Sequence, residues 1–260
     1  ALEAGATDFL IKPLDEHETR ARCANLLELR RHKIVLSDQA RVLQYQVDKS
    51  VSEIHERELE TLAKLAKAGE FRDKVTGNHL LRMAKYSALI GQHLGLGGET
   101  VHVLEVAAPM HDIGKIGTPD DILLKPGPLT AAERREMERH AAVGHEILAE
   151  SQSELLRMAA RIALTHHERY DGTGYPHGLA GEAIPIEGRI TAVADVFDAL
   201  LSERSYQAAM PVDQAKDLIA EGRGSQFDPD VVDALLADLD ASRTARSHGT
   251  LAPADLTLRS

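Results

Sequence analysis

Residues 110–115 read MHDIGK, and residues 166–190 read HHERYDGTGYPHGLAGEAIPIEGRI. Neighbouring residues on a helix point about 100° apart, so His111 and Asp112 can converge on one point only at a helix edge, as they would around a metal ion. Lys115 follows His111 by four residues, which predicts that it faces the same way and could place a positive charge beside a bound phosphate. Alone, a His-Asp dipeptide is typical of a solvated surface pair, so the metal hypothesis depends on partners elsewhere in the chain.

Such partners are present in other segments of the sequence. Asp195 lies in the apolar sequence AVADVFDAL, where an unpaired carboxylate would be costly to bury. Five imidazoles and two carboxylates from different segments form a ligand set that two divalent ions would require. The candidate metal ligands are His79, His111, Asp112, His140, His166, His167 and Asp195.

The two motifs, with His140 between them and the Asp195 segment after them, resemble the HD-GYP family of bacterial cyclic di-GMP phosphodiesterases. This family is a branch of the HD metal-dependent phosphohydrolases, and the resemblance covers about residues 60–240. It implies two divalent metal ions, usually iron or manganese. A carboxylate has two oxygens and can bridge two ions, whereas a neutral imidazole offers one nitrogen. The resemblance gives one ion His79, His111, Asp112 and Asp195, and the other His140, His166, His167 and the shared Asp112.

The resemblance also implies roles at the substrate. His111, Asp112 and Lys115 would form the catalytic group. Asp73 matches a family position near the substrate, although it is also what an ordinary carboxylate at a helix end looks like. Tyr175 would touch the ligand, or a partner such as a diguanylate cyclase domain through the loop Gly174-Tyr175-Pro176, unless that loop is purely structural.

Two positions depart from the family pattern. Val75 stands four residues before His79, where some members carry a Glu that supports a third metal, so a dinuclear site is expected. Gln207 stands where the family often has a Lys, which leaves Lys115 and Arg204 as the cations expected beside the substrate phosphate.

The fold class predicted from the sequence is all-α. Helical patterns dominate residues 68–241, read as the catalytic domain, and no alternating strand pattern of any length is present. This favours an all-helical bundle, which the resemblance implies is of the HD type, followed by a flexible tail over 242–260. Helices are expected over 77–94, 99–113, 130–151, 153–167, 186–201, 212–223 and 230–239.

The N-terminal part predicts a different organisation. Residues 14–67 contain neither Pro nor Gly and have Leu29, Leu36 and Leu43 at intervals of seven, which predicts a long linker helix. Such a helix could form a parallel homodimer, or it could lie on its own domain. Residues 1–13 resemble the last strand and Lys-Pro turn of a response-regulator receiver, and so would be a short remnant of an α/β domain controlled by a histidine kinase. The alternative is a generic strand-turn-helix segment.

Composition excludes several function classes. The net charge of −11 provides no basic field for a polyphosphate backbone, and the absence of Trp, with 4 Phe and 5 Tyr, disfavours stacking on bases, so no DNA partner is expected. The 13 histidines favour imidazole chemistry. With a single cysteine, Cys23, and no visible apolar span or signal peptide, we expect a soluble cytoplasmic protein without a membrane partner.

Three functional hypotheses follow. The leading one is hydrolysis of cyclic di-GMP to pGpG or GMP by a dinuclear site, as the output domain of a two-component response regulator. The second is a catalytically weak HD-GYP module that acts through ligand or protein binding, and Gln207 is its only support. The third keeps the enzyme but changes the substrate to another cyclic dinucleotide or a nucleoside monophosphate.

Overall fold

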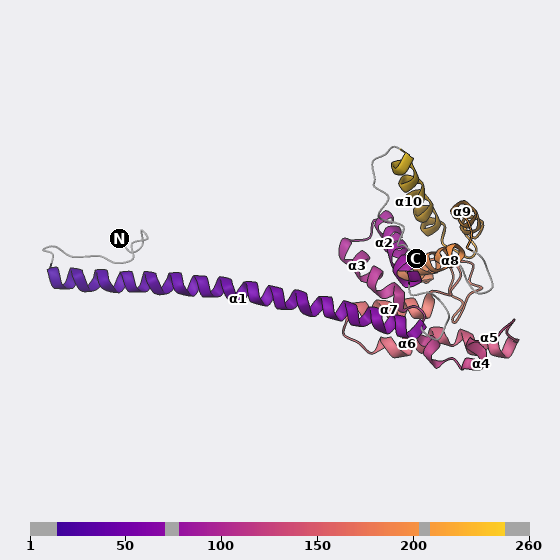
Figure 1. Ribbon diagram of the computed structural model, residues 1–260, viewed down its shortest axis with the longest axis horizontal. Coiled ribbons are helices and arrows are strands. Elements are labelled where there is room, and N and C mark those ends of the chain that lie inside the picture. The colour runs from indigo at the N-terminus through magenta and orange to yellow at the C-terminus, as the bar shows by residue number, and fades with distance from the viewer. Residues whose placement is uncertain (1–14, 71–77, 203–208, 248–260) are drawn as a thin grey trace. The chain divides into compact units, whose positions relative to one another are not determined.

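The computed structural model describes residues 15–70, 78–202 and 209–247 (Figure 1). The chain divides into two compact units, Ala1–Glu58 and Leu59–Ser260. The described residues contain helices and two isolated β-bridges but no strand, which confirms the all-α class.

Helix α1 (Glu16–Glu70) supplies the helical residues of the first unit, and its last turns belong to the second. It begins with Glu16 and Glu18 in its first turn and has Lys67 in its last, charges that favour the two ends of the helix dipole. Ion pairs one turn apart support it, such as Arg20–Glu16 at 3.0 Å. The long helix expected over 14–67 is therefore present, and its leucines at intervals of seven are exposed.

The second unit is a bundle whose core lies among α2 (Asn78–His93), α3 (Gly98–Ala107), α7 (Glu154–Thr165) and α8 (Ile186–Leu201), with buried side chains of α9 (Val212–Glu221) and α10 (Pro229–Ser247) packed against them. Helix α8 contacts α2, α7 and α9, and α7 also contacts α3 and α6. Small residues let α6 and α7 approach closely, because a Cβ added to Gly144 would lie 3.0 Å from the Cβ of Ala163. The fully buried side chains include Met83, Ile90, Leu104, Ile162 and Phe197. The α-helices of this unit after α1 are α2 (Asn78–His93), α3 (Gly98–Ala107), α4 (Asp120–Leu123), α5 (Ala131–Glu138), α6 (His140–Ala149), α7 (Glu154–Thr165), α8 (Ile186–Leu201), α9 (Val212–Glu221) and α10 (Pro229–Ser247).

The helix expected over 99–113 is wrong in its last part. Helix α3 ends at Ala107, and the chain continues as two short 3₁₀ helices, η2 (Ala108–Met110) and η3 (Ile113–Gly117). Pro109 at the start of η2 has no N–H to donate and clashes with the preceding turn, so it cannot continue α3. His111 and Asp112 consequently lie in a turn between the 3₁₀ helices, and not along a regular α-helix.

The helix expected over 130–151 is divided into α5 and α6. Thr130 and Glu133 form a capping box that begins α5. The division falls at Arg139, whose N–H bonds to Glu136 O at 3.3 Å, a tighter 3₁₀-type contact. At the C-terminal end the helical part of α10 continues to Ser247, past residue 242, where a flexible tail was expected.

Removing Asp228 is expected to destabilise the bundle. Its carboxylate pairs with Arg189, and the side chains are 3% and 16% exposed. Its second oxygen accepts from the N–H of Asp230 at 2.9 Å, at the start of α10. Asp228→Ala would leave a largely buried guanidinium without this partner, and we expect a loss of about 3 kcal/mol in unfolding free energy in urea titrations. The matched control is Asp233→Ala, which breaks the ion pair between Asp233 of α10 and Arg223. Its carboxylate is 55% exposed, so the variant should leave the urea midpoint nearly unchanged. Equal losses of unfolding free energy in the two variants would contradict a stabilising role of the buried Asp228–Arg189 pair.

None of the described helices combines the length and the apolar character that a membrane span requires.

Candidate metal centre

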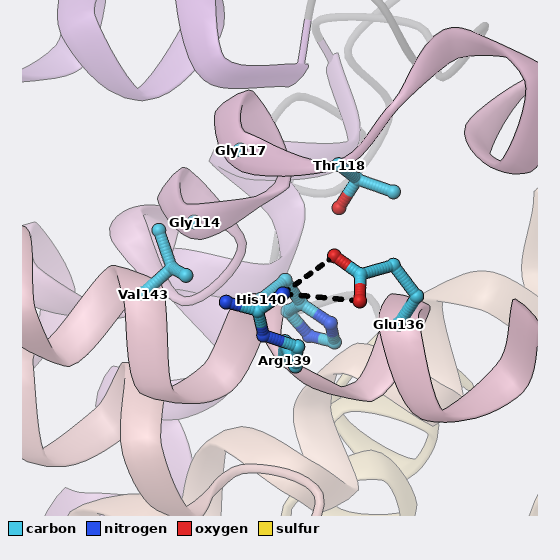
Figure 2. Close-up of a pocket in the computed structure, with 7 residues that line it drawn as sticks. All are labelled: Gly114, Gly117, Thr118, Glu136, Arg139, His140 and Val143. Atoms are coloured by element: carbon cyan, nitrogen blue, oxygen red, sulfur yellow. Dashed lines mark hydrogen bonds and ion pairs between the residues drawn. The ribbon is translucent and has the colours of Figure 1, made fainter. Parts of the chain in front are cut away.

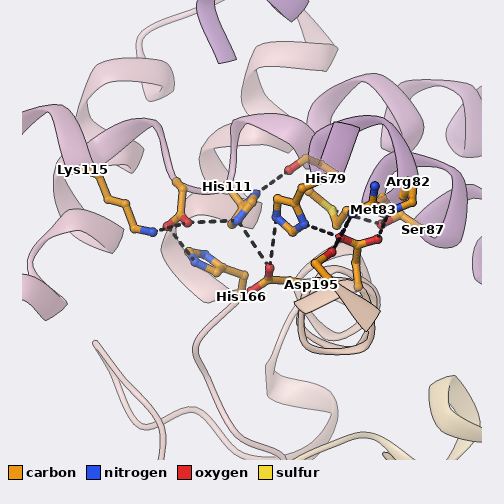
Figure 3. A network of polar contacts seen from close by, with 12 residues as sticks. His79, Arg82, Met83, Ser87, His111, Lys115, His166 and Asp195 are labelled. Atoms are coloured by element: carbon orange, nitrogen blue, oxygen red, sulfur yellow. Dashed lines mark hydrogen bonds and ion pairs between the residues drawn. The ribbon is translucent and has the colours of Figure 1, made fainter. Parts of the chain in front are cut away.

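One group of candidate ligands comes from α2, the His-Asp turn and α8 (Figure 3). It consists of His79, His111 and Asp195, whose ligand atoms all lie within 4.8 Å of one another. Asp195 Oδ1 is 3.5 Å from His79 Nε2 and 4.0 Å from His111 Nε2. Three segments that are far apart in the sequence thus present nitrogen and oxygen atoms to one small volume.

A second group lies beside the first and consists of Asp112, His140, His166 and His167. Asp112 Oδ1 is 3.3 Å from His140 Nε2 and 3.7 Å from His166 Nε2. The other oxygen of Asp112, Oδ2, is 3.2 Å from His111 Nε2, which belongs to the first group. The two carboxylate oxygens of Asp112 therefore face the two groups separately.

Hydrogen bonds on the far side of four rings determine which nitrogen faces the centre. His111 Nδ1 lies 3.1 Å from Ala108 O, and His140 Nδ1 lies 2.6 Å from Met137 O. His166 Nδ1 is 3.1 Å from Ile162 O. A carbonyl oxygen only accepts, so each of these Nδ1 atoms carries the proton and leaves Nε2 as the lone-pair nitrogen that a metal needs. His79 Nδ1 is held in the same way by the carboxylate of Asp198.

Buried polar atoms without hydrogen-bond partners show that these residues fit a divalent cation. Asp112 Oδ1, His140 Nε2 and His166 Nε2 are buried and have no hydrogen-bond partner, and each such atom costs about 1–3 kcal/mol. They converge on one volume, where a cation would satisfy all of them. A mixed imidazole and carboxylate set without thiolate suits a divalent first-row transition metal. The residues present therefore fit a metal.

Protonation states agree with this fit. Burial lowers the pKa of His140 to about 4, and burial together with neighbouring imidazoles holds the pKa of His167 well below its usual range, so both rings are neutral near pH 7. Burial would raise the pKa of Asp112, but Lys115, whose Nζ is 2.7 Å from Oδ2, and His111 outweigh it and hold the pKa well below its usual range. His140, His167 and Asp112 are therefore deprotonated before any metal binds.

Tyr175 lies against the second group. Its ring stacks on His167 with centroids 4.7 Å apart and an interplanar angle of 28°, and it meets His140 edge-on at 6.3 Å. Burial raises the pKa of its hydroxyl, which keeps it protonated. The loop that carries it is anchored by Glu168, a buried carboxylate not singled out from the sequence, which accepts from the N–H groups of His177 at 2.8 Å and Leu179 at 3.0 Å.

Asp198 is a further residue that sequence reasoning missed. It is fully buried and lies 2.6 Å from His79 Nδ1, and Arg82 donates to both its oxygens at 2.6 and 2.9 Å. Burial would raise the pKa of Asp198, but the hydrogen bonds from His79 and Arg82 outweigh it, so the group is ionised. The available signal was a second carboxylate three residues after Asp195 in AVADVFDAL, on neighbouring positions of one helix face.

We expect Asp198→Asn to weaken metal binding by the His79 group. An amide cannot accept from His79 Nδ1 with the strength of a carboxylate, and loss of such an orienting partner typically lowers metal affinity about 10–100-fold. Titration with Mn²⁺ followed by electron paramagnetic resonance would measure the change. Asp217→Asn, an exposed position on α9, is the matched control. Unchanged affinity in Asp198→Asn would contradict an orienting role.

Four positions singled out from the sequence lie outside the described residues, and they are Asp73, Val75, Arg204 and Gln207. Lys115 is among the described residues, and its ammonium group contacts the Asp112 carboxylate.

Beside the centre is a small pocket bounded by η3, α5 and α6 (Figure 2). It shares His140 with the centre, and its other lining residues belong to neither ligand group. The pocket is lined by Gly114, Gly117, Thr118, Glu136, Arg139, His140 and Val143.

Comparison with known proteins identifies the family. A family model described as "HD domain" matches residues 49–231. The chain belongs to the HD domain family. This match spans both groups of candidate ligands, because His79 and Asp195, the outermost of the seven, lie within it.

Two similar curated proteins are named as phosphodiesterases of cyclic dinucleotides. The chain is 52% identical to the cyclic di-GMP phosphodiesterase response regulator RpfG of Xanthomonas campestris pv. campestris, covering 91% of this chain and 62% of that protein. It is 42% identical to 3'3'-cGAMP-specific phosphodiesterase 2 of Vibrio cholerae, covering 72% of this chain and 36% of that protein. The chain thus spans less than two thirds of the length of these curated relatives. Together with the motif at 166–190, they support the HD-GYP type of HD domain.

A solved structure shows the same fold. The crystal structure of a cyclic GMP-AMP specific phosphodiesterase of V. cholerae matches with a TM-score of 0.57 and 21% identity, over 75% of this chain and 51% of that one. The helical HD-type arrangement predicted from the sequence is therefore confirmed.

Proposed function

We propose that this HD domain is a metal-dependent phosphodiesterase that hydrolyses cyclic di-GMP to pGpG or GMP. The observation that carries the proposal is the placement of Asp112, whose two oxygens face two adjacent groups of histidine and aspartate ligands. The 52% identity to a cyclic di-GMP phosphodiesterase supports the substrate. That relative is a response regulator, which supports an output role under a histidine kinase and a receiver remnant at 1–13.

The centre would hold two divalent ions, iron or manganese, in the groups of His79 and His140. When bound, such ions activate water for attack and neutralise charge on the phosphodiester. The protein itself contributes the preorganisation. Backbone carbonyls hold the imidazoles with Nε2 inward, Lys115 keeps Asp112 ionised, and Tyr175 shields one side of His167 from water. Arg204 is proposed to contact the substrate phosphate.

The loop Gly174-Tyr175-Pro176 is proposed to border the substrate. Because the Tyr175 ring lies on His167, the more exposed neighbours Pro176 and His177 are better placed for a partner such as a diguanylate cyclase domain. The substrate and partner roles of this loop therefore involve different residues.

Turnover by the wild-type protein tests the proposed activity. Protein purified without oxygen and loaded with Fe²⁺ or Mn²⁺ is incubated with cyclic di-GMP, 3'3'-cGAMP and GMP in parallel, and products are separated by HPLC. We expect cyclic di-GMP to be consumed fastest, with close to two metals per chain. Two bound metals without turnover of any substrate would favour the catalytically weak module. Faster turnover of 3'3'-cGAMP would shift the substrate to that of the V. cholerae relative.

We also propose that residues 14–67 form a linker that makes a parallel homodimer. The apolar side chains at intervals of seven are exposed, with Leu29 at 64%, Leu36 at 64% and Leu43 at 60%. An isolated helix that exposes such a stripe is poorly stabilised in water, and a second copy of the same helix buries it as a coiled coil.

Leu36→Glu is expected to convert the dimer to a monomer, because two carboxylates would face each other across the apolar seam. Sedimentation equilibrium would measure the mass. Val42→Glu is the matched control, since Val42 is 54% exposed but lies off the seam. A wild-type monomer, or an equal effect of both variants, would contradict the coiled coil.

A further inference from the structure

The last turns of α1 make a close contact with Ile113, the first residue of η3. Lys67 and Ala68 are exposed, whereas Ala66 is 2% exposed and Gly69 is buried. A Cβ added to Gly69 would lie 2.9 Å from Ile113 Cδ1 and 3.4 Å from Ile113 Cα. Glycine costs about 1 kcal/mol in a helix relative to alanine, so its presence here is explained by the approach of α1 to the Ile113 backbone.

Ile113 is enclosed on its opposite side by α6. A Cβ added to Gly144 would lie 3.5 Å from Ile113 Cγ2, and one added to the neighbouring Gly114 would overlap His140 O. The 3₁₀ helix η3 is therefore seated between the end of α1 and the start of α6, with no space to move toward α6. A displacement of α1 against Ile113 would therefore be passed on to its neighbours, because packed protein interiors are close to incompressible.

The 3₁₀ helix η3 is directly linked to Asp112. Ile113 is the next residue in the chain, and the N–H of Lys115 donates to Asp112 O at 3.0 Å, which ties η3 to the carboxylate residue. Asp112 has little tolerance for movement, since its Oδ1 lies 3.3 Å from His140 Nε2 and its Oδ2 lies 3.2 Å from His111 Nε2.

We propose that Gly69 and Ile113 are positioning residues for Asp112. The end of α1 presses on Ile113 and thereby sets the carboxylate between the two ligand groups, so a displacement of α1 at Gly69 changes metal binding and turnover. The effect on turnover rests on the proposed function, but the effect on metal binding does not. An active site misplaced by about 1 Å can lose about 100-fold in rate, so a contact of this closeness is sufficient to modulate the centre.

Substitution at Gly69 tests the proposal, with Ala68→Val as a matched control that introduces the same side chain at an exposed position of the same turn. The measurements are Mn²⁺ affinity by paramagnetic resonance titration, kcat and KM for cyclic di-GMP, and the melting temperature. We expect Gly69→Val to weaken Mn²⁺ binding and lower kcat, each at least about 10-fold, with KM changed less than about twofold. Ala68→Val should match the wild type in all of these.

A second pair of variants with smaller changes in side-chain volume keeps the test decisive if Gly69→Val folds poorly. Gly69→Ala adds only the Cβ that meets Ile113 Cδ1, and Ile113→Val removes that atom. We expect Gly69→Ala to weaken Mn²⁺ binding and the double variant to restore it. The proposal is overturned if Gly69→Val lowers only the melting temperature, or if Ile113→Val fails to rescue Gly69→Ala. Absence of turnover in the wild type would contradict the proposed function alone, because Mn²⁺ affinity still reports on the position of Asp112.

Discussion

Asp112→Asn is expected to lower hydrolysis of cyclic di-GMP by on the order of 1,000-fold and to remove both metals from the centre. The carboxylate serves two groups at once, with Oδ1 toward His140 and His166 and Oδ2 toward His111. An amide keeps the shape but offers one oxygen and one NH₂, and an NH₂ cannot bind a cation. The exchange also removes the 2.7 Å ion pair with Lys115 and places an uncharged group beside it.

Metal content and turnover separate this outcome from simple misfolding. Metal is measured by plasma emission spectroscopy on protein loaded without oxygen, and turnover by HPLC. Asp195→Asn should lose only the ion of the His79 group, since Asp195 lies in one of the two groups. Asp121→Asn, an exposed carboxylate on α4, should behave as the wild type. Two metals and undiminished turnover in Asp112→Asn would refute the shared role of this carboxylate.

The largest effect on folding is expected from Gly114→Ala. A Cβ at this position would overlap His140 O and Gly144 N. Both are backbone atoms, so η3 and α6 would have to separate, whereas a clash with the end of a side chain could be relieved by rotation. Overpacking of cores typically costs about 1–3 kcal/mol and occasionally more, and we expect at least about 3 kcal/mol here.

In Gly114→Ala, the unfolding free energy from urea titration and the Mn²⁺ affinity should fall together, because the displaced carbonyl belongs to His140, a candidate ligand of the second group. Gly98→Ala is the matched control. It lies in the first turn of α3, has no atom within 4 Å of its added Cβ, and should alter unfolding free energy by less than about 0.5 kcal/mol. A Gly114→Ala variant as stable as Gly98→Ala would show that η3 and α6 are not packed this closely.

The candidate ligands could be recognised from the sequence alone because His and Asp in dense motifs are chemically unusual. His166 and His167 are adjacent, and His111 and Asp112 are adjacent, so two short stretches contain four of the seven residues. The structure brings all seven into two groups that touch through Asp112. Their roles as metal ligands stay a prediction that the metal titrations above address.

Local pattern was less informative about where helices end. Pro109 prevents α3 from continuing beyond Ala107, yet the apolar periodicity of 99–113 extends past it, and periodicity alone favoured one helix. Residues whose importance comes from long-range contacts were the hardest to recognise. Asp198 and Glu168 look like ordinary acidic residues until His79 and the backbone of 177–179 are placed against them.

The sequence by itself determined the helical class, the long helix α1 and the identity of the candidate ligands, because periodicity, the absence of Pro and Gly, and unusual residue chemistry are properties of the chain alone. Only the tertiary structure decided that Asp112 faces both groups, that Asp198 holds His79, and that Gly69 and Gly144 enclose Ile113. Each of these depends on the distance between atoms from different helices. Such distances are set by close packing across the whole bundle, which no local pattern of residues encodes.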